Sequence, residues 1–389
     1  MMKDARGSVL SPQEPASPQA LAAAVSEAAS AGTAVRFAGG RTKLAWGSPV
    51  PGALEISTKG LTTIHEHNAG DLTAVVDAGV TLAELRAEAG SAGQMLALDP
   101  PLGEGDEATL GGIVATGDSG PLRHRYGSAR DLVVGMTVAL SDGTLAKTGG
   151  KVIKNVAGYD ISKLFTGAYG TLGAILGVSV RLHPLSPTTA TAVGRSDDPG
   201  LIGSTAAGLS HAQVELQSLD VRWEANAGAV LARFGGASAA EPARDAAGAM
   251  GEQGLETEVS EDDGELWDSQ RAGQRSSAGT VVRVSGLQTQ IPELLRTART
   301  LGARVVGRAG LGLFWVTLPS ESNAAEGVES LRRAMAPSPC VVLDAPEEVR
   351  GAVDVWTAPD PATLVLMRRV KERFDPAGVC APGLYVGGL

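Results

Sequence analysis

Glycines gather in short clusters along one dense run of the chain, from Leu98 to Pro184. The clusters include Thr109-Leu110-Gly111-Gly112, Gly117-Asp118-Ser119-Gly120 and Gly170-Thr171-Leu172-Gly173, and apolar stretches separate them. Glycine lets the backbone approach a ligand closely and adopt positive φ angles. Repeated glycines beside small hydroxyl residues predict backbone N–H groups that wrap an extended, anionic ligand.

A second glycine loop, Gly39-Gly40-Arg41-Thr42-Lys43-Leu44, lies upstream and follows the strand-like residues Val35 to Ala38. A pyrophosphate carries two negative charges and needs several convergent donors. The glycines offer close backbone N–H groups, Thr42 offers a hydroxyl, and Arg41 and Lys43 offer positive charge. Taken alone, the loop also fits an ordinary turn with surface cations. The downstream glycine run favours the anion-binding interpretation.

Composition limits the class of protein. The chain has 389 residues, of which 43% are hydrophobic, so two or three domains with a sizeable core are expected. The net charge of −10 argues against nucleic-acid binding, which needs a basic surface. Two cysteines, Cys340 and Cys380, are too few for a disulfide framework or an ordinary iron–sulfur cluster. They are predicted to be buried as small apolar side chains.

Targeting and membrane signals are not evident in the sequence. No apolar stretch of 18 residues is free of charge or glycine, so neither a transmembrane helix nor direct membrane insertion is expected. The N-terminal residues lack the apolar segment of a secretory signal, which favours a cytoplasmic protein. Residues 1–17 are polar, contain several prolines and are predicted to be a disordered tail.

Local patterns predict the elements of the N-terminal half. Ser17-Pro18 is typical of a helix start, and Thr81 with Glu84 is typical of a capping box. Asp142-Gly143 indicates a hairpin turn. Helices are expected at 18–30, 81–88, 111–116 and 161–166, and strands at 35–38, 53–57, 61–65, 73–77, 131–140, 144–147 and 174–182.

Beyond Pro187 the pattern changes to strands that alternate with helices. Strands are expected at 214–223, 229–234, 281–286 and 314–318, and helices at 242–251, 263–275, 291–301, 322–335 and 361–374. This alternation predicts a second domain of the α+β plait type.

Taken in order, the loop at 39–44, Pro100-Pro101 and the segments TLGG, YGSARD, KNVAGYD and GTLGAI resemble one known family. They resemble the FAD-binding domain of the vanillyl-alcohol oxidase / p-cresol methylhydroxylase superfamily, and within it the FAD-binding subunit of bacterial glycolate oxidase. The likeness covers roughly residues 20–185. Weaker matches are Glu265-Leu266-Trp267-Asp268 and the tail Phe374-Asp375-Pro376-Ala377-Gly378.

The resemblance implies an α+β fold with two parts. A two-part FAD-binding domain of the vanillyl-alcohol oxidase / p-cresol methylhydroxylase type would occupy residues 18–187, and an α+β plait cap domain would occupy residues 188–360. A C-terminal helix and tail, residues 361–389, would return to the FAD domain. Relatives usually carry an asparagine before the Pro-Gly of this tail, where the present chain has Ala381.

The resemblance also implies FAD as the cofactor, with its pyrophosphate in the loop at 39–44. Several relatives attach the flavin to a histidine of this loop. No histidine lies between Arg36 and Trp46, so non-covalent FAD is predicted. The residues implied to contact FAD are Gly39, Gly40, Arg41, Thr42, Lys43, Leu44, Pro101, Gly103, Thr109, Leu110, Gly111, Gly112, Ala115, Thr116, Gly117, Ser119, Gly120, Gly127, Ser128, Gly170, Gly173 and Ile175.

Candidates for the chemistry are fewer. Lys154 could place a positive charge near the flavin or a substrate carboxylate, and Tyr159 could donate a hydrogen bond or support a turn. Arg283 is a possible carboxylate binder, the alternative being a surface ion pair. Catalytic relatives carry a paired-histidine metal motif in the cap domain. Only His211 lies in that part of the present chain, so no metal site is expected.

The leading functional hypothesis is an FAD-binding oxidoreductase subunit of a glycolate oxidase-like complex. It would pass electrons from a small 2-hydroxy acid through FAD to a partner. The partners implied are a second FAD subunit that bears the histidine motif and an iron–sulfur subunit. One alternative is a self-sufficient FAD-dependent oxidase or dehydrogenase of a small hydroxy acid or alcohol. The other is a flavin-fold scaffold that only assembles partners.

Overall fold

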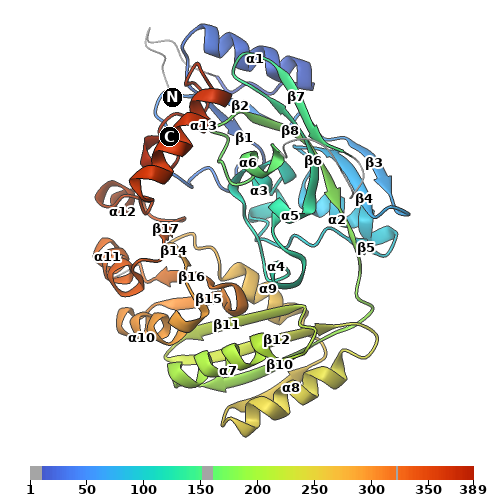
Figure 1. Ribbon diagram of the computed structural model, residues 1–389, viewed down its shortest axis with the longest axis vertical. Helices are drawn as coiled ribbons and strands as arrows, with labels where there is room; N and C mark the ends of the chain where they lie inside the picture. Colours follow the sequence, from blue (N-terminus) through green and yellow to red (C-terminus); the bar gives the residue numbers. More distant parts are fainter. Residues whose placement is uncertain (1–10, 151–160, 321–322) are drawn as a thin grey trace. The chain divides into compact units, whose positions relative to one another are not determined.

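The structure is a computed structural model, which describes residues 11–150, 161–320 and 323–389 (Figure 1). The chain divides into two compact units. The first contains the residues up to Ser119, together with Gly127–Leu185 and Ala358–Leu389. The second contains Gly120–Tyr126 and Ser186–Thr357. The domain predicted at residues 18–187 includes the short segment Gly120–Tyr126, which the structure groups with the second unit.

The first unit begins with a helix packed on a two-stranded parallel sheet. Helix α1 (Pro18–Ser30) starts as predicted, because the Ser17 hydroxyl accepts a hydrogen bond from the Ala20 N–H at 3.2 Å. Strand β1 (Val35–Ala38) pairs with β2 (Leu54–Ser57) in parallel. Their apolar side chains share one core cluster with α1, and β1 ends directly at the Gly39 loop.

A five-stranded antiparallel sheet forms the rest of the first unit, in the order β3-β4-β8-β6-β7. Its strands are β3 (Ile64–Asn68), β4 (Thr73–Asp77), β8 (Ala174–Arg181), β6 (Val133–Ala139) and β7 (Leu145–Gly149). A small pair is formed by β5 (Gln94–Met95) and β9 (His183–Pro184). The connecting segments include α2 (Leu82–Ser91), η1 (Glu104–Asp106), α3 (Leu110–Thr116), α5 (Ala129–Leu132) and α6 (Ser162–Phe165).

Two of these strands differ from the sequence prediction. Strand β3 begins at Ile64, three residues later than expected. Strand β6 begins at Val133 because Asp131 accepts hydrogen bonds from both the N–H and the hydroxyl of Ser128, which caps the short helix α5. A capping signal inside the segment therefore outweighed its strand-like composition.

The second unit is built on one eight-stranded sheet, in the order β13-β10-β12-β11-β15-β16-β14-β17. Its strands are β10 (Thr189–Ser196), β11 (Ser218–Glu224), β12 (Ala227–Gly235), β13 (Glu256–Ser260), β14 (Thr280–Ser285), β15 (Arg304–Arg308), β16 (Leu313–Leu318) and β17 (Cys340–Val342). Its helices are α4 (Arg123–Tyr126), α7 (Pro199–His211), α8 (Ala240–Glu252), α9 (Gly264–Ala272), α10 (Ile291–Leu301), α11 (Ala324–Met335) and α12 (Glu347–Ala352), with the short turns η2 (Gln288–Gln290) and η3 (Ala309–Leu311).

The two faces of this sheet differ in chemistry. One face is apolar and is covered by α7, α8, α10 and α11, and Figure 1 shows α8 running along β10. A Cβ atom on Gly194 would meet Met250 of α8, and one on Gly228 would meet Ile202 of α7. The other face, which we call the polar face, mixes charged and apolar residues. Val193, Ala229 and Leu231 on this face cluster with Trp267 of α9, whose indole donates to the Thr191 hydroxyl at 2.8 Å.

The sequence patterns did not predict several elements of the second unit. Strands β10, β13, β15 and β17 and helix α7 were not predicted, and β11 begins at Ser218 rather than at residue 214. Alanine, threonine and glycine dominate β10, so it lacks a clear alternation of large apolar residues. Helix α7 contains Gly200, Gly203 and Gly208, which lower its helix propensity, yet Asp198 and Pro199 start it.

The C-terminal segment belongs to the first unit. Helix α13 (Pro361–Phe374) is followed by a tail, with a 3-10 turn η4 (Val386–Gly388), that pairs with β1. The Val35 N–H donates to Val379 and the Ala381 N–H donates back to Val35, both at 2.8 Å. Ala381 has a φ of 45°, a conformation that asparagine tolerates better than alanine. Both cysteines are buried and free, as predicted.

A buried ion pair holds this tail in place. The Lys371 ammonium donates to the carbonyl oxygens of Thr171 and Cys380, at 2.7 and 2.6 Å, and to the Asp375 carboxylate at 2.6 Å. Asp375 also accepts from the Cys380 N–H at 2.8 Å. Burial by itself raises the pKa of Asp375, but the hydrogen bonds from Lys371 and Cys380 outweigh it and hold that pKa below its usual value.

We expect Asp375→Asn to lower the free energy of unfolding by about 3 kcal/mol, because it leaves a largely buried ammonium without its carboxylate. The pKa of Asp375 is lower in the folded protein than in the unfolded chain, where it is near 3.8. The ionised carboxylate therefore stabilises the wild-type fold fully above pH 3.8, and this stabilisation is lost as the pH falls through the folded pKa. Denaturant melts at pH 7 and at acid pH measure both effects. The matched control is Glu372→Gln on the exposed side of α13, expected to change stability by less than about 0.5 kcal/mol. An equal loss in the two variants would contradict the assignment.

Candidate functional site

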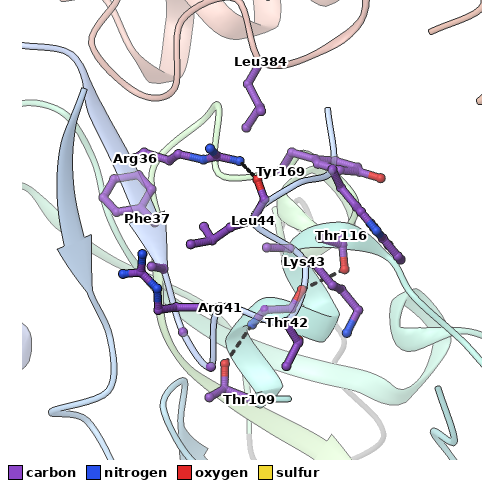
Figure 2. Close-up of a pocket in the computed structure, with 16 residues that line it drawn as sticks. Arg36, Phe37, Arg41, Thr42, Lys43, Leu44, Thr109, Thr116, Tyr169 and Leu384 are labelled. Carbon is purple, nitrogen blue, oxygen red and sulfur yellow. Dashed lines mark hydrogen bonds between the residues drawn. The ribbon is translucent and has the colours of Figure 1, made fainter. Parts of the chain in front are cut away.

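The first unit contains an open pocket at the end of β1. About 520 Å³ of empty space lies between the loop that follows β1, helix α3 and the C-terminal tail. Figure 2 shows Arg41, Thr42, Lys43 and Leu44 on one loop, with Thr109 and Thr116 on the α3 side. The lining residues are Arg36, Phe37, Ala38, Gly39, Gly40, Arg41, Thr42, Lys43, Leu44, Trp46, Thr109, Gly112, Ala115, Thr116, Tyr169 and Leu384.

Two consecutive glycines let the loop lie against the segment before α3. A Cβ atom on Gly39 would overlap the Thr109 hydroxyl, and one on Gly40 would overlap the carbonyl oxygen of Glu107. Both obstacles are fixed, because Glu107 contributes backbone and Thr109 caps α3 by accepting from the Gly112 N–H. The pocket wall therefore requires glycine at both positions.

The same loop presents unpaired backbone donors. Among the described residues, the N–H groups of Gly39, Gly40 and Arg41 donate no hydrogen bond within the protein. Arg41 has a φ of 59°, so the direction of the backbone changes at that residue. Successive N–H groups around a left-handed residue form a concave anion-binding nest. Such a nest fits the phosphate oxygens of a dinucleotide.

The three cations of the loop region are already engaged. Arg41 pairs with Glu55, and its side chain is 56% exposed. The Lys43 ammonium lies 3.3 Å from the Asp118 carboxylate, with both side chains almost fully buried, and 5.8 Å from the centre of the Trp46 ring. Arg36 donates to the Leu44 carbonyl oxygen. Lys43 therefore ties the loop to the glycine segment after α3. The N–H groups of the pocket-lining residues Gly39, Gly40 and Arg41 have no partner in the described part of the chain.

The other side of the pocket consists of small residues. Gly112, Ala115 and Thr116 line it from α3, where the Thr116 hydroxyl donates to the Gly112 carbonyl at 2.8 Å. Tyr169, with a φ of 57°, donates its N–H to the Ala115 carbonyl at 2.8 Å, so the chain before Gly170 lies against α3. Small side chains here leave room for a flat group beside the helix.

The structure places the predicted cofactor residues in two groups. Those that line this pocket are Gly39, Gly40, Arg41, Thr42, Lys43, Leu44, Thr109, Gly112, Ala115 and Thr116. Those that lie outside it are Pro101, Gly103, Leu110, Gly111, Gly117, Ser119, Gly120, Gly127, Ser128, Gly170, Gly173 and Ile175. Contact of either group with FAD stays a prediction.

Several residues of the second group have evident packing roles. Leu110 and Gly111 are buried in α3, and a Cβ atom on Gly111 would meet Ala78. Gly117 ends α3 in a left-handed conformation, with a φ of 63°. Ile175 is buried in β8. These glycines and apolar residues shape the wall behind the pocket.

Sequence reasoning missed Arg36, Phe37, Ala38, Trp46, Tyr169 and Leu384 as lining residues. Arg36, Phe37 and Ala38 immediately precede the glycine pair, so their place in β1 was a usable signal. Leu384 reaches the pocket because the C-terminal tail pairs with β1. No local sequence pattern predicts this pairing.

The catalytic candidates lie elsewhere. Lys154 and Tyr159 are outside the described residues. Arg283 lies on β14 in the second unit, directly opposite Trp315 of β16. The alternative prediction for Arg283 was a surface ion pair. Within the described part of the chain Arg283 forms no ion pair, and its Nε is buried without a hydrogen bond. Within the same ranges, no group of three or more His, Cys, Asp or Glu residues gathers as for a metal, and no helix is long and apolar enough to span a bilayer.

Comparison with known proteins supports FAD as the ligand of the first unit. Residues 13–149 match the family model described as FAD binding domain. Over 166 residues the chain is 39% identical to the glycolate oxidase subunit GlcE of Escherichia coli, a match that covers 43% of this chain and 47% of that protein. The match therefore spans about half the length of that relative. It confirms the resemblance to glycolate oxidase subunits and the prediction of FAD.

Two further matches cover nearly the whole chain. An uncharacterised FAD-linked oxidoreductase of Mycobacterium tuberculosis is 27% identical over 96% of this chain and 90% of its own length. A solved structure of alkyldihydroxyacetonephosphate synthase superposes with a TM-score of 0.69 at 16% identity, covering 95% of this chain and 76% of that one. The structural likeness confirms the expected fold class.

We expect Gly40→Ala to lower the affinity for FAD at least ~10-fold, because the loop must move away from Glu107. Tenfold corresponds to about 1.4 kcal/mol of binding free energy. The flavin-to-protein ratio of the purified chain, read from its absorbance, and a titration with added FAD measure this. Gly90→Ala is the control, because Gly90 lies in α2 with no atom near its missing Cβ. A Gly40→Ala protein that retains full flavin would refute the role of the close approach.

Proposed function

We propose, from the premise that residues 13–149 form an FAD-binding domain, that the chain is an FAD-dependent oxidoreductase acting on the CH–OH group of a small 2-hydroxy acid. The identity to a glycolate oxidase subunit supports this substrate class. In such a reaction the hydroxy acid loses two electrons and two protons and becomes a 2-oxo acid. Bound FAD would supply the two-electron acceptor.

The observation that carries the proposal is the nest at Gly39, Gly40 and Arg41. Its N–H groups are oriented by β1 and by the contact with Glu107, and a pyrophosphate would satisfy them. The residues from Arg36 to Trp46 include no histidine, and Lys43, the one lysine among them, is paired with Asp118. We therefore propose that FAD is held without a covalent bond.

Arg283 is proposed to bind the substrate carboxylate. The Nε of Arg283 and the indole Nε1 of Trp315, directly opposite on β16, are both buried without a hydrogen bond. Unmade hydrogen bonds of buried donors are costly, and a carboxylate could accept from both. The stacking of Arg308 on the Trp315 ring, 4.5 Å from its centre, fixes that indole in place.

We further propose that the chain works within a complex, as its relative's name as a subunit suggests. A second FAD subunit and an iron–sulfur subunit would complete the complex and carry electrons onward. The second candidate function is a self-sufficient dehydrogenase, which the two buried donors at Arg283 and Trp315 favour because they offer this chain its own carboxylate site.

The purified chain should show a flavin spectrum, and acid denaturation should release the flavin into the supernatant. The spectrum is then recorded without oxygen before and after addition of glycolate. Unchanged oxidised flavin that becomes reduced when the partner subunits are added supports the subunit hypothesis. Bleaching by glycolate alone supports the self-sufficient enzyme.

Two outcomes would overturn parts of the proposal. Flavin that stays with the denatured polypeptide refutes non-covalent binding. A colourless protein that cannot be reconstituted with FAD refutes the flavoenzyme and favours a scaffold.

Arg283→Met should weaken glycolate binding to the FAD-loaded protein by about 10- to 100-fold, the range expected for loss of a charge-assisted hydrogen bond. Calorimetric titration measures this without turnover, so it applies to both candidate functions. Arg195→Met is the control, because Arg195 lies on the same sheet but pairs with Glu258 at 2.6 Å. Equal weakening in both variants would mean that only the general charge matters.

A further inference from the structure

The polar face of the eight-stranded sheet is rich in arginine. Strand register places Arg195 on β10, Arg222 on β11, Arg233 on β12, Arg283 on β14, and Arg304 and Arg308 on β15 on this one face. The chain as a whole carries a net charge of −10. A concentration of guanidinium groups here is therefore contrary to the overall charge.

Most of these arginines have a carboxylate partner. Arg233 forms two hydrogen bonds with Asp263, and Arg308 is buried 3.6 Å from Asp220. Arg195 pairs with Glu258. In each such pair the carboxylate neutralises the arginine and occupies its N–H donors, so the arginine offers little charge to a ligand.

Arg222 differs from these. In the described structure its side chain makes no ion pair and one hydrogen bond, of 3.1 Å, to the hydroxyl of Ser269, a neutral acceptor. Its neighbour Arg304 lies 3.7 Å from Glu224, with both side chains more than half exposed. An exposed pair at that distance is weak, so both guanidinium groups can take another anion.

These residues line a groove of about 630 Å³ between the sheet and the end of α9. Arg275, the third guanidinium of the groove, forms a bidentate pair with Asp344 and stays fixed at one side. A Cβ atom on Gly273 would press on Val306, so glycine lets the chain after α9 lie close to the groove floor. The full lining is Arg222, Trp223, Glu224, Ser269, Ala272, Gly273, Arg275, Arg304, Val305 and Val306.

The lining carries three guanidinium groups and one carboxylate. Asp344 neutralises Arg275, and Glu224 partly neutralises Arg304, so about one positive charge of the groove is uncompensated. A ligand that displaces Glu224 from Arg304 would meet two positive charges, those of Arg222 and Arg304. Guanidinium groups match the paired oxygens of phosphate and carboxylate, and Arg is preferred over Lys where two oxygens are bound at once. The volume admits a small organic molecule behind such a head group.

We propose that this groove is a binding site for a small dianion, a phosphate monoester or a dicarboxylate, held by Arg222 and Arg304. The site is separate from the proposed carboxylate position at Arg283. Strands β15 and β16 lie between β11 and β14, so Arg222 and Arg283 are three strand spacings apart, roughly 14 Å. The inference does not depend on the proposed oxidoreductase function.

The test is calorimetric titration of the full-length protein with inorganic phosphate and, separately, with succinate, at constant ionic strength set by chloride. Wild type should bind at least one of them saturably, and the stronger one identifies the head group. The variant Arg222→Gln/Arg304→Gln should lose on the order of tenfold or more in affinity. Glu224→Gln should gain affinity several-fold, because it removes the carboxylate that competes for Arg304.

Two controls locate the effect. Arg244→Gln removes an exposed arginine of α8 that pairs with Glu261, and Arg283→Gln removes the proposed substrate contact. Both should bind the dianion as wild type does. The proposal is overturned if wild type binds neither anion at millimolar concentration, if the controls lose as much affinity as the double variant, or if Glu224→Gln binds no better than wild type. Loss in Arg283→Gln alone would assign the anion to the substrate position instead.

Discussion

The close contact between the Gly39-Gly40 loop and the backbone around Glu107 is the constraint on which the first unit depends. Without a Cβ at either position the loop can lie against the start of α3. The N–H groups of the three pocket-lining residues Gly39, Gly40 and Arg41 then have no partner in the described protein. The buried pair of Lys43 with Asp118 fastens the far end of the loop to the segment after α3. Binding of a dinucleotide phosphate is thus prepared by the backbone, while the side-chain charges serve mainly to hold the loop.

The C-terminal tail completes this arrangement from the opposite end of the chain. The Lys371 ammonium joins α13 to the carbonyl groups of Thr171 and Cys380, and the tail then pairs with β1 immediately before the glycine loop. Leu384 reaches the pocket as a consequence. A segment more than three hundred residues away in sequence therefore supports the strand that positions the phosphate nest.

The second unit separates its two tasks onto the two faces of one sheet. The apolar face packs against α7, α8, α10 and α11 and supplies one core, while the polar face adds a smaller cluster of Val193, Ala229 and Leu231 around Trp267 of α9. The polar face also carries Arg222, Arg283 and Arg304. Beside Trp267 of α9, where this face is covered, Arg233 is paired with the buried carboxylate of Asp263, which offsets the cost of desolvation.

The sequence by itself determined the features that depend on neighbouring residues. The start of α1 at Ser17, the capping box of α2, β1 with its glycine loop, and the FAD assignment all follow from local patterns and from the order of the motifs. The tertiary structure decided what depends on distant pairing. Examples are the tail against β1, the partner of Lys43, and the register that gathers arginines from separate strands onto one face. Strand β10 and helix α7 escaped prediction because small residues and glycines give little local preference, and packing against the rest of the second unit stabilises them.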